Sequence, residues 1–213
     1  MKKALFCLSL LAVLALTACG GSKDAAEPTP TPLPEEIINN PVASDDGMAS
    51  DPGMEVTPET ATEPDVDAEL SGMVDKLYEA HPVDLMLLTT SAVNLNDLSW
   101  LTYNTGLTAD QATLVDAGVL SESLTGSQAY SLVLLRVKDK ADAQTIADAI
   151  LDNIQMNKWV CTMADKARVA TFDDKVLFVM TNSELTDVDA LMSAAPDALG
   201  VTFDYQNSKD AEI

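Results

Sequence analysis

Residues 129–138 read AYSLVLLRVK, and this stretch decides the fold class because it is the clearest strand in the sequence. Residues Leu132 to Leu135 are apolar without interruption. Strands that are buried on both faces have such continuous apolar runs, whereas strands with one solvent-exposed face alternate apolar and polar residues. We therefore expect residues 129–138 to lie in the middle of a sheet, covered on at least one face.

A helix and a hairpin are predicted directly after this strand. Residues 139–156 carry Ile146, Ile150 and Ile154 on one helical face, and Asp139 is placed to cap that helix. Two apolar stretches on either side of an acidic turn then indicate a hairpin. Its strands are residues 167–172 and 176–181, joined by Asp173 and Asp174.

The last predicted element is a helix over residues 183–195, closed by Pro196. No element is predicted from about Gly200 onward. We place the end of the folded domain at residue 205 and interpret residues 206–213 as a C-terminal tail.

Before the central strand, a first helix is indicated by apolar residues on one face, and Pro82 ends it. These residues are Val66, Leu70, Met73, Val74, Leu77 and Tyr78. Residues 84–93 predict a strand, with a buried helix as the alternative. Residues 95–103 predict a short helix.

A further helix is predicted over residues 108–118, TADQATLVDAG. Thr108 and Gln111 have the spacing of a capping box, in which each side chain accepts from the other residue's backbone N–H. Gly118 is interpreted as the residue that ends this helix.

The order of these elements favours the α+β class. Helices mixed with a hairpin predict one small domain, residues 66–205, with a mostly antiparallel sheet and helices packed on it. About 140 residues can hold one hydrophobic core. The sequence has no internal repeat.

The N-terminus has the pattern of a signal peptide. Lys2 and Lys3 precede an apolar run from Ala4 to Leu16, interrupted only by Ser9. This run is shorter than the roughly 20 residues that a membrane-spanning helix needs. We therefore interpret residues 1–18 as a signal peptide.

Residues Leu16-Thr17-Ala18-Cys19 resemble the lipobox of bacterial lipoproteins, in which a small residue precedes a cysteine. The resemblance implies that the Cys19 thiol receives a diacylglycerol and that the chain is cut before it. Attached acyl chains anchor a protein to a membrane by about 0.8 kcal/mol per buried CH₂ group. The expected location is the extracytoplasmic face of the bacterial cell membrane. A plain signal peptide with an incidental cysteine is the alternative.

Residues 19–65 are predicted to be a disordered linker. Eight of the ten prolines lie between Pro28 and Pro64, among threonines and acidic residues. Such a composition cannot bury enough apolar surface to offset the entropy of an ordered chain. The linker is interpreted as a tether that separates the domain from the membrane.

The chain is strongly acidic, with 34 Asp and Glu against 12 Lys and Arg. Nucleic acid binds through Lys and Arg, so a nucleic-acid partner is not expected. Anionic lipid headgroups are also repelled by this charge. A solvated surface is the favoured interpretation, and a basic partner or loosely bound cations are the alternatives.

No residue pattern predicts a catalytic, cofactor or metal site. His81 is the only histidine and is interpreted as a helix-end residue. Cys7 lies in the predicted signal peptide and Cys19 is the predicted lipid site, so Cys161 is the one remaining cysteine, and we expect it to be a small buried side chain. Trp100 and Tyr103 form either an aromatic ledge for a glycan or peptide or part of the core, and core packing is favoured. Trp159 has the same two interpretations.

The lipobox, the Pro-rich acidic linker and the segments VDKLYEAHPVDLMLLT, AYSLVLLRVKD and ARVATFDDKVLFVMT together resemble a family of small uncharacterised lipoproteins. These lipoproteins come from low-GC Gram-positive bacteria and contain a domain of unknown function. The family brings no known active site, so the resemblance assigns no functional residues. The anchor, the long tether and the lack of a catalytic motif in the sequence favour a lipid-anchored, non-enzymatic interaction or binding module with an unknown envelope partner. A solute-binding lipoprotein and a carboxylate-dependent extracellular hydrolase are the alternatives.

Overall fold

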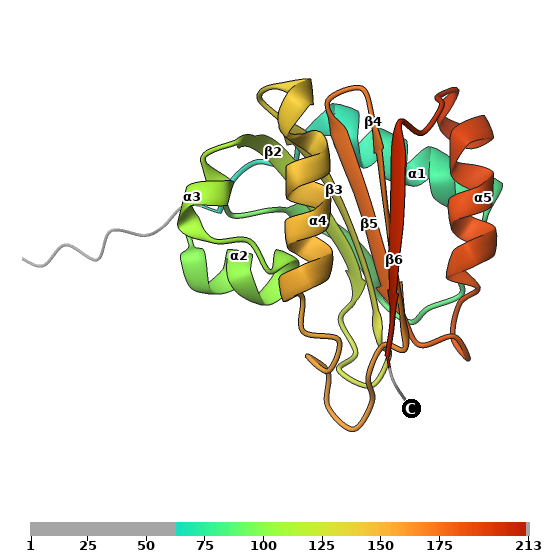
Figure 1. The fold of residues 1–213 in the computed structure, drawn as a ribbon. Helices are drawn as coiled ribbons and strands as arrows, with labels where there is room; N and C mark the ends of the chain where they lie inside the picture. The colour runs from blue at the N-terminus through green and yellow to red at the C-terminus, as the bar shows by residue number, and fades with distance from the viewer. Residues whose placement is uncertain (1–62, 212–213) are drawn as a thin grey trace, which may run out of the picture. The chain divides into compact units, whose positions relative to one another are not determined.

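The structure is a computed structural model that describes residues 63–211 (Figure 1). Its strands form one six-stranded sheet with the order β1-β2-β3-β5-β4-β6, and every neighbouring pair is antiparallel. The predicted α+β domain with an antiparallel sheet is confirmed. The predicted signal peptide, Cys19 and residues 19–62 of the predicted linker lie outside the described residues. The strands are β1 (Leu88–Ala92), β2 (Val115–Ser123), β3 (Tyr130–Val137), β4 (Lys166–Phe172), β5 (Lys175–Thr181) and β6 (Tyr205–Asp210).

Helices cover both faces of the sheet (Figure 1). Helices α1 and α5 share a core with one face, and α4 shares a second core with the other, where α2 also packs. A short 3₁₀ helix, capped by Asp139, precedes α4. The helices are α1 (Ala68–Ala80), α2 (Leu98–Thr105), α3 (Ala109–Ala112), α4 (Ala143–Asn153) and α5 (Val188–Leu199), with the 3₁₀ helix at Lys140–Asp142.

The apolar run of β3 follows from this three-layer arrangement. Val133 and Leu135 belong to the core under α4, whereas Leu132 and Leu134 belong to the core under α1 and α5. Successive side chains of a strand point to opposite faces, so each of these four residues faces a core and an apolar side chain is favoured at every one of them. The predicted central strand is confirmed, and it is covered on both faces.

The predicted helix over residues 108–118 is wrong beyond its first turn. The Thr108–Gln111 capping box is present, but α3 ends at Ala112 and β2 begins at Val115. Gly118 lies inside β2, where an added Cβ would come within 2.5 Å of Leu135 Cδ2. Gly118 is therefore needed for close packing and does not end a helix.

The predicted end of α5 is also wrong. The helix continues through Pro196 to Leu199 and ends at Gly200, which has a φ of 69°. A proline in a helix removes one backbone donor. The apolar face of α5 holds the helix on the sheet on both sides of that position, with Leu191 and Ala195 before it and the partly buried Ala198 and Leu199 after it.

The interpretation of residues 206–213 as a tail is corrected by β6, which spans Tyr205–Asp210 and pairs with β4 at the sheet edge. Its sequence YQNSKD lacks the apolar alternation that marks a strand. Side-chain hydrogen bonds hold it instead: the Tyr205 hydroxyl donates to Asp148, and Lys209 Nζ donates to the Leu151 carbonyl.

The sheet has two ends that differ in their connections. Four segments lie at one end, which we call the loop end: residues 81–87, 124–129, 154–165 and 182–187. In Figure 1 the loop end is the lower end of the domain. The first described residues lie at the opposite end, where Pro64 and Asp67 border a hollow with Ala92 and Asp116. The described part of the chain therefore begins at the end away from these four segments.

Candidate functional site

Exposed apolar side chains gather at the loop end. Six of the nine large apolar side chains that are exposed among residues 63–211 lie on its four segments. Four of them, at 65–70% exposure, are called the apolar patch here: Met86, Leu87, Leu124 and Val160. The other two are Met163 and Leu185. An exposed apolar group of this kind is typical of an interaction surface.

Hydrogen bonds between the segments hold the patch in place. The Leu124 N–H donates to the Leu87 carbonyl at 3.2 Å, and the Val160 N–H donates to the Gly126 carbonyl at 2.9 Å. The Gln128 side chain accepts from the Met86 N–H at 2.9 Å. Three segments far apart in sequence therefore present their apolar side chains on one prearranged surface.

Two residues of the loop end have left-handed backbone. Leu87 has a φ of 51° and Cys161 a φ of 60°. The remaining non-glycine residue with positive φ among residues 63–211 is Asp173, in the β4–β5 turn. The left-handed region costs an L-residue roughly 1–2 kcal/mol. Strain of this kind concentrates at functional sites, where the surrounding structure imposes it.

Leu87→Gly is expected to raise the free energy of unfolding by about 0.5–1 kcal/mol. The relief of left-handed strain exceeds the extra chain entropy of glycine, and the exposed Leu87 side chain contributes little burial. Urea denaturation measures the change, with Asp173→Gly as the matched variant away from the loop end. A lower free energy of unfolding for Leu87→Gly would show that the Leu87 side chain is buried against the domain and is not exposed to a partner.

The expectation of a buried Cys161 is wrong, because its side chain is exposed. The residue follows Val160 in a segment that crosses the loop end without helix or strand. Its backbone is left-handed. Cys161 is the one cysteine among the described residues.

A buried lysine, Lys158, holds this segment against the domain. Its side chain is 2% exposed, and its Nζ donates to Asn104 Oδ1 at 2.9 Å and to Glu122 Oε2 at 3.0 Å. A third hydrogen bond joins Nζ to Ser131 Oγ at 3.3 Å. The three donors of the ammonium group therefore each have an acceptor.

Aromatic rings complete the surroundings of the Lys158 ammonium. Its Nζ lies 5.5 Å from the ring centre of Tyr103 and 5.2 Å from that of Trp159, both within cation–π range. The Tyr103 hydroxyl also donates to the Lys158 carbonyl at 2.6 Å. Burial lowers the pKa of Lys158 from its ordinary value, and the charge of Glu122 opposes that shift.

The three aromatic residues singled out in the sequence have different environments. Tyr103 is 52% exposed, so the expected core packing is wrong for it. Trp100 and Trp159 are partly buried against the core under α4. His81 lies at the end of α1, as expected, and its backbone N–H donates to the Leu77 carbonyl.

A hollow of about 280 Å³ opens beside Lys158 at the edge of the apolar patch. Apolar and aromatic side chains form most of its wall, and the Glu122 carboxylate also borders it. The lining residues are Tyr103, Glu122, Ser123, Leu124, Gly126, Lys158, Trp159 and Val160. Such a hollow suits an aliphatic or aromatic side chain of a partner.

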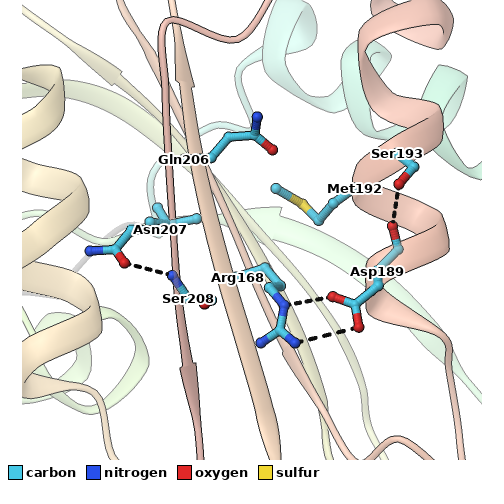
Figure 2. Close-up of a pocket in the computed structure, with 8 residues that line it drawn as sticks. Arg168, Asp189, Met192, Ser193, Gln206, Asn207 and Ser208 are labelled. Atoms are coloured by element: carbon cyan, nitrogen blue, oxygen red, sulfur yellow. Dashed lines mark hydrogen bonds and ion pairs between the residues drawn. The ribbon is translucent and has the colours of Figure 1, made fainter.

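A second concavity, of about 320 Å³, lies between α5 and strands β4 and β6 (Figure 2). Arg168 on β4 donates through Nε to Asp189 on α5 at 2.6 Å, and it also pairs with Asp210. Lys166 Nζ lies 2.8 Å from Asp189 Oδ2. The charged groups of this groove therefore bind one another.

The hydrogen bonds from Arg168 and Lys166 lower the pKa of Asp189 to about 2. A general acid in glycoside hydrolysis needs a carboxyl group with a raised pKa, which keeps its proton near neutral pH. Asp189 therefore stays ionised and does not suit that role.

Because its pKa is lowered, Asp189 stabilises the folded state above pH 3.8, and this contribution is lost as the pH falls toward 2. The side chain is half exposed, so we expect about 1 kcal/mol at neutral pH. Asp189→Asn should lower the free energy of unfolding by that amount and flatten its dependence between pH 4 and 2, relative to Asp197→Asn on the same helix. Equal acid profiles for the two variants would contradict the assignment.

Comparisons with protein-family models, curated proteins and solved structures found no match to this chain. Among residues 63–211, none of the helices has the length and apolar character required to cross a membrane. In the same part of the chain, no three His, Cys, Asp or Glu side chains are grouped to hold a metal ion.

Proposed function

We propose that the chain is a lipid-anchored, extracytoplasmic interaction module that binds a protein of the cell envelope through its loop end. Cys19 carries the lipid, and the following residues connect it to the domain. One observation carries the proposal: the exposed apolar side chains gather at the end of the sheet opposite to Pro64–Asp67. A domain linked to a membrane at one end is free to present its other end to a partner.

The arrangement of the loop end supports binding over catalysis. Lys158 is a buried titratable residue beside the hollow. Its ammonium group donates hydrogen bonds to Asn104, Glu122 and Ser131. A nucleophilic lysine needs a free amine. In this setting Lys158 fixes the segment that presents Val160, which is a positioning role.

The anchor is tested by Cys19→Ala in the native host or a bacterium that processes lipoproteins. The unmodified chain should appear in the membrane fraction at the mass of a processed, acylated protein. The variant should remain at precursor mass without acylation. A Cys19→Ala chain found in the membrane at the mature mass would overturn the lipid assignment.

The interaction is tested by a photo-reactive amino acid placed at Leu124 in the anchored chain in living cells. We expect one discrete crosslinked product, identified by mass spectrometry, that is lost when Val160→Ser is added. The matched control places the same group at Leu98, which is 50% exposed on α2. Equal products from both positions, or a product that Val160→Ser leaves unchanged, would overturn the proposed role of the loop end.

A further inference from the structure

We infer that the partner of the loop end presents apolar side chains flanked by lysine or arginine side chains. This inference rests on the proposed function and adds the chemistry of the partner. Two features carry it: the apolar patch with its adjoining hollow, and the acidic side chains carried by the same four segments.

The charge at the loop end is one-sided. Its four segments carry the acidic residues Asp84, Asp165, Glu184 and Asp187, and they contain no arginine. Lys158 is their one lysine, and its ammonium is buried and paired with Glu122. Asp84 and Glu184 are exposed and form no ion pair within residues 63–211. A partner that approaches the loop end therefore meets negative charge as well as the apolar patch.

The apolar contacts provide most of the expected affinity. A large aliphatic or aromatic side chain of the partner enters the hollow between Leu124 and Val160, against the rings of Tyr103 and Trp159. Buried anchors of this type dominate the energies of protein interfaces. Basic side chains of the partner are attracted by the exposed carboxylates of Asp84 and Glu184 at the same end of the domain, which speeds association and excludes acidic partners.

The same charges argue against two other occupants. A second copy of the domain would bring its own Asp84 and Glu184 toward those of the first, so like charges would face one another. An anionic lipid surface would be repelled by the same carboxylates. A cationic apolar protein segment is the occupant that matches both the apolar patch and the acidic charge of the same four segments.

The test uses the purified chain from Gly20 to Ile213, which keeps every residue of both cores. Three short peptides share the same leucine and tryptophan residues and differ only in carrying lysine, glutamine or glutamate at the other positions. We expect the lysine peptide to bind about tenfold more tightly than the glutamine peptide, and the glutamate peptide not to bind. Raising the salt concentration from about 0.05 to 0.5 M should remove most of the lysine peptide's advantage.

Matched variants separate the two contributions. Leu124→Ser with Val160→Ser should lower the affinity for the lysine and glutamine peptides alike by about tenfold or more, whereas Leu98→Ser should leave both unchanged. Asp84→Asn with Glu184→Gln should weaken only the lysine peptide by about fivefold, and the control pair Asp110→Asn with Asp197→Asn should not. Circular dichroism of each variant establishes that it is folded.

Three outcomes would overturn the inference. These are equal binding of the lysine and glutamine peptides, self-association of the chain that Val160→Ser abolishes, and binding to phosphatidylglycerol vesicles that Val160→Ser abolishes. If any of them occurs while the crosslink at Leu124 in cells still depends on Val160, the proposed function stands and only the chemistry of the partner is wrong.

Discussion

Gly106→Ala is expected to lower the free energy of unfolding by about 3 kcal/mol. Gly106 ends α2 with a left-handed φ of 72°. A Cβ added there would lie 2.9 Å from the Ile154 backbone nitrogen and 3.0 Å from the Asn153 carbonyl carbon. The substitution therefore adds left-handed strain and a clash with backbone that cannot rotate away.

Gly200→Ala is the matched control for this prediction. Gly200 has nearly the same φ, 69°, but an added Cβ there meets nothing within 4 Å. Only the strain of the left-handed region remains, so we expect a loss of about 1 kcal/mol. Urea denaturation of the two variants isolates the clash as their difference. Equal losses would contradict the close contact between the end of α2 and the end of α4.

The consequence of Gly106→Ala reaches the loop end. Helix α2 carries Tyr103 and Asn104, which contact Lys158, and Ile154 begins the segment that presents Val160. Pushing α2 away from Ile154 separates the two sides of this contact. Hydrogen exchange of residues 154–165 should therefore increase more in Gly106→Ala than in Gly200→Ala.

The central part of the fold is readable from the sequence because its determinants are local. Leu132 to Leu135 form a continuous apolar run, and a strand with a core on each face has that signature wherever it occurs. The β4–β5 hairpin is similarly local, with Phe172 opposite Lys175 across the turn. Helices α1 and α4 show their buried faces as apolar residues at helical spacing.

Strands β2 and β6 depend on residues that are distant in the chain. The capping box at Thr108 is a correct local signal, but pairing of β2 with β1 and β3 ends that helix after one turn. Strand β6 is polar and becomes a strand because the edge of β4 is available to pair with it. Neither effect is visible in a short stretch of sequence, since tertiary contacts override local preference.

The candidate site is even less visible in the sequence. The three acceptors of Lys158 lie 27, 36 and 54 residues away, so no motif connects them. Met86, Leu87, Leu124 and Val160 have the composition of core residues, and only the fold places them outside. One signal in the sequence points to this site. Lys158 is followed directly by Trp159 in a segment without helical or strand periodicity, and a lysine next to an aromatic residue can form a cation–π contact.

Lys158→Met is expected to lower the free energy of unfolding by about 2–3 kcal/mol. Methionine keeps the apolar stem but leaves the buried Asn104 Oδ1 without its donor and Glu122 without its cation. The Glu122 side chain is 30% exposed, so its carboxylate is partly hydrated when Lys158 is removed. The loss of stability is therefore smaller than that expected when one partner of a fully buried ion pair is removed. Lys166→Met, which removes an exposed ion pair with Asp189, should cost less than about 1 kcal/mol.

The cause of the loss is separated by a double variant and by pH. Adding Glu122→Gln to Lys158→Met should restore part of the stability, because the unpaired carboxylate is then gone. In the unmodified chain, the lowered pKa of Lys158 means that the unfolded chain binds more protons between that pKa and 10.5, so stability rises with pH there. Lys158→Met should lack this rise, whereas Lys166→Met should keep it. If Lys158→Met retains the rise and costs no more than Lys166→Met, Lys158 does not hold the loop end, and Val160 must be positioned by its backbone contact with Gly126 alone.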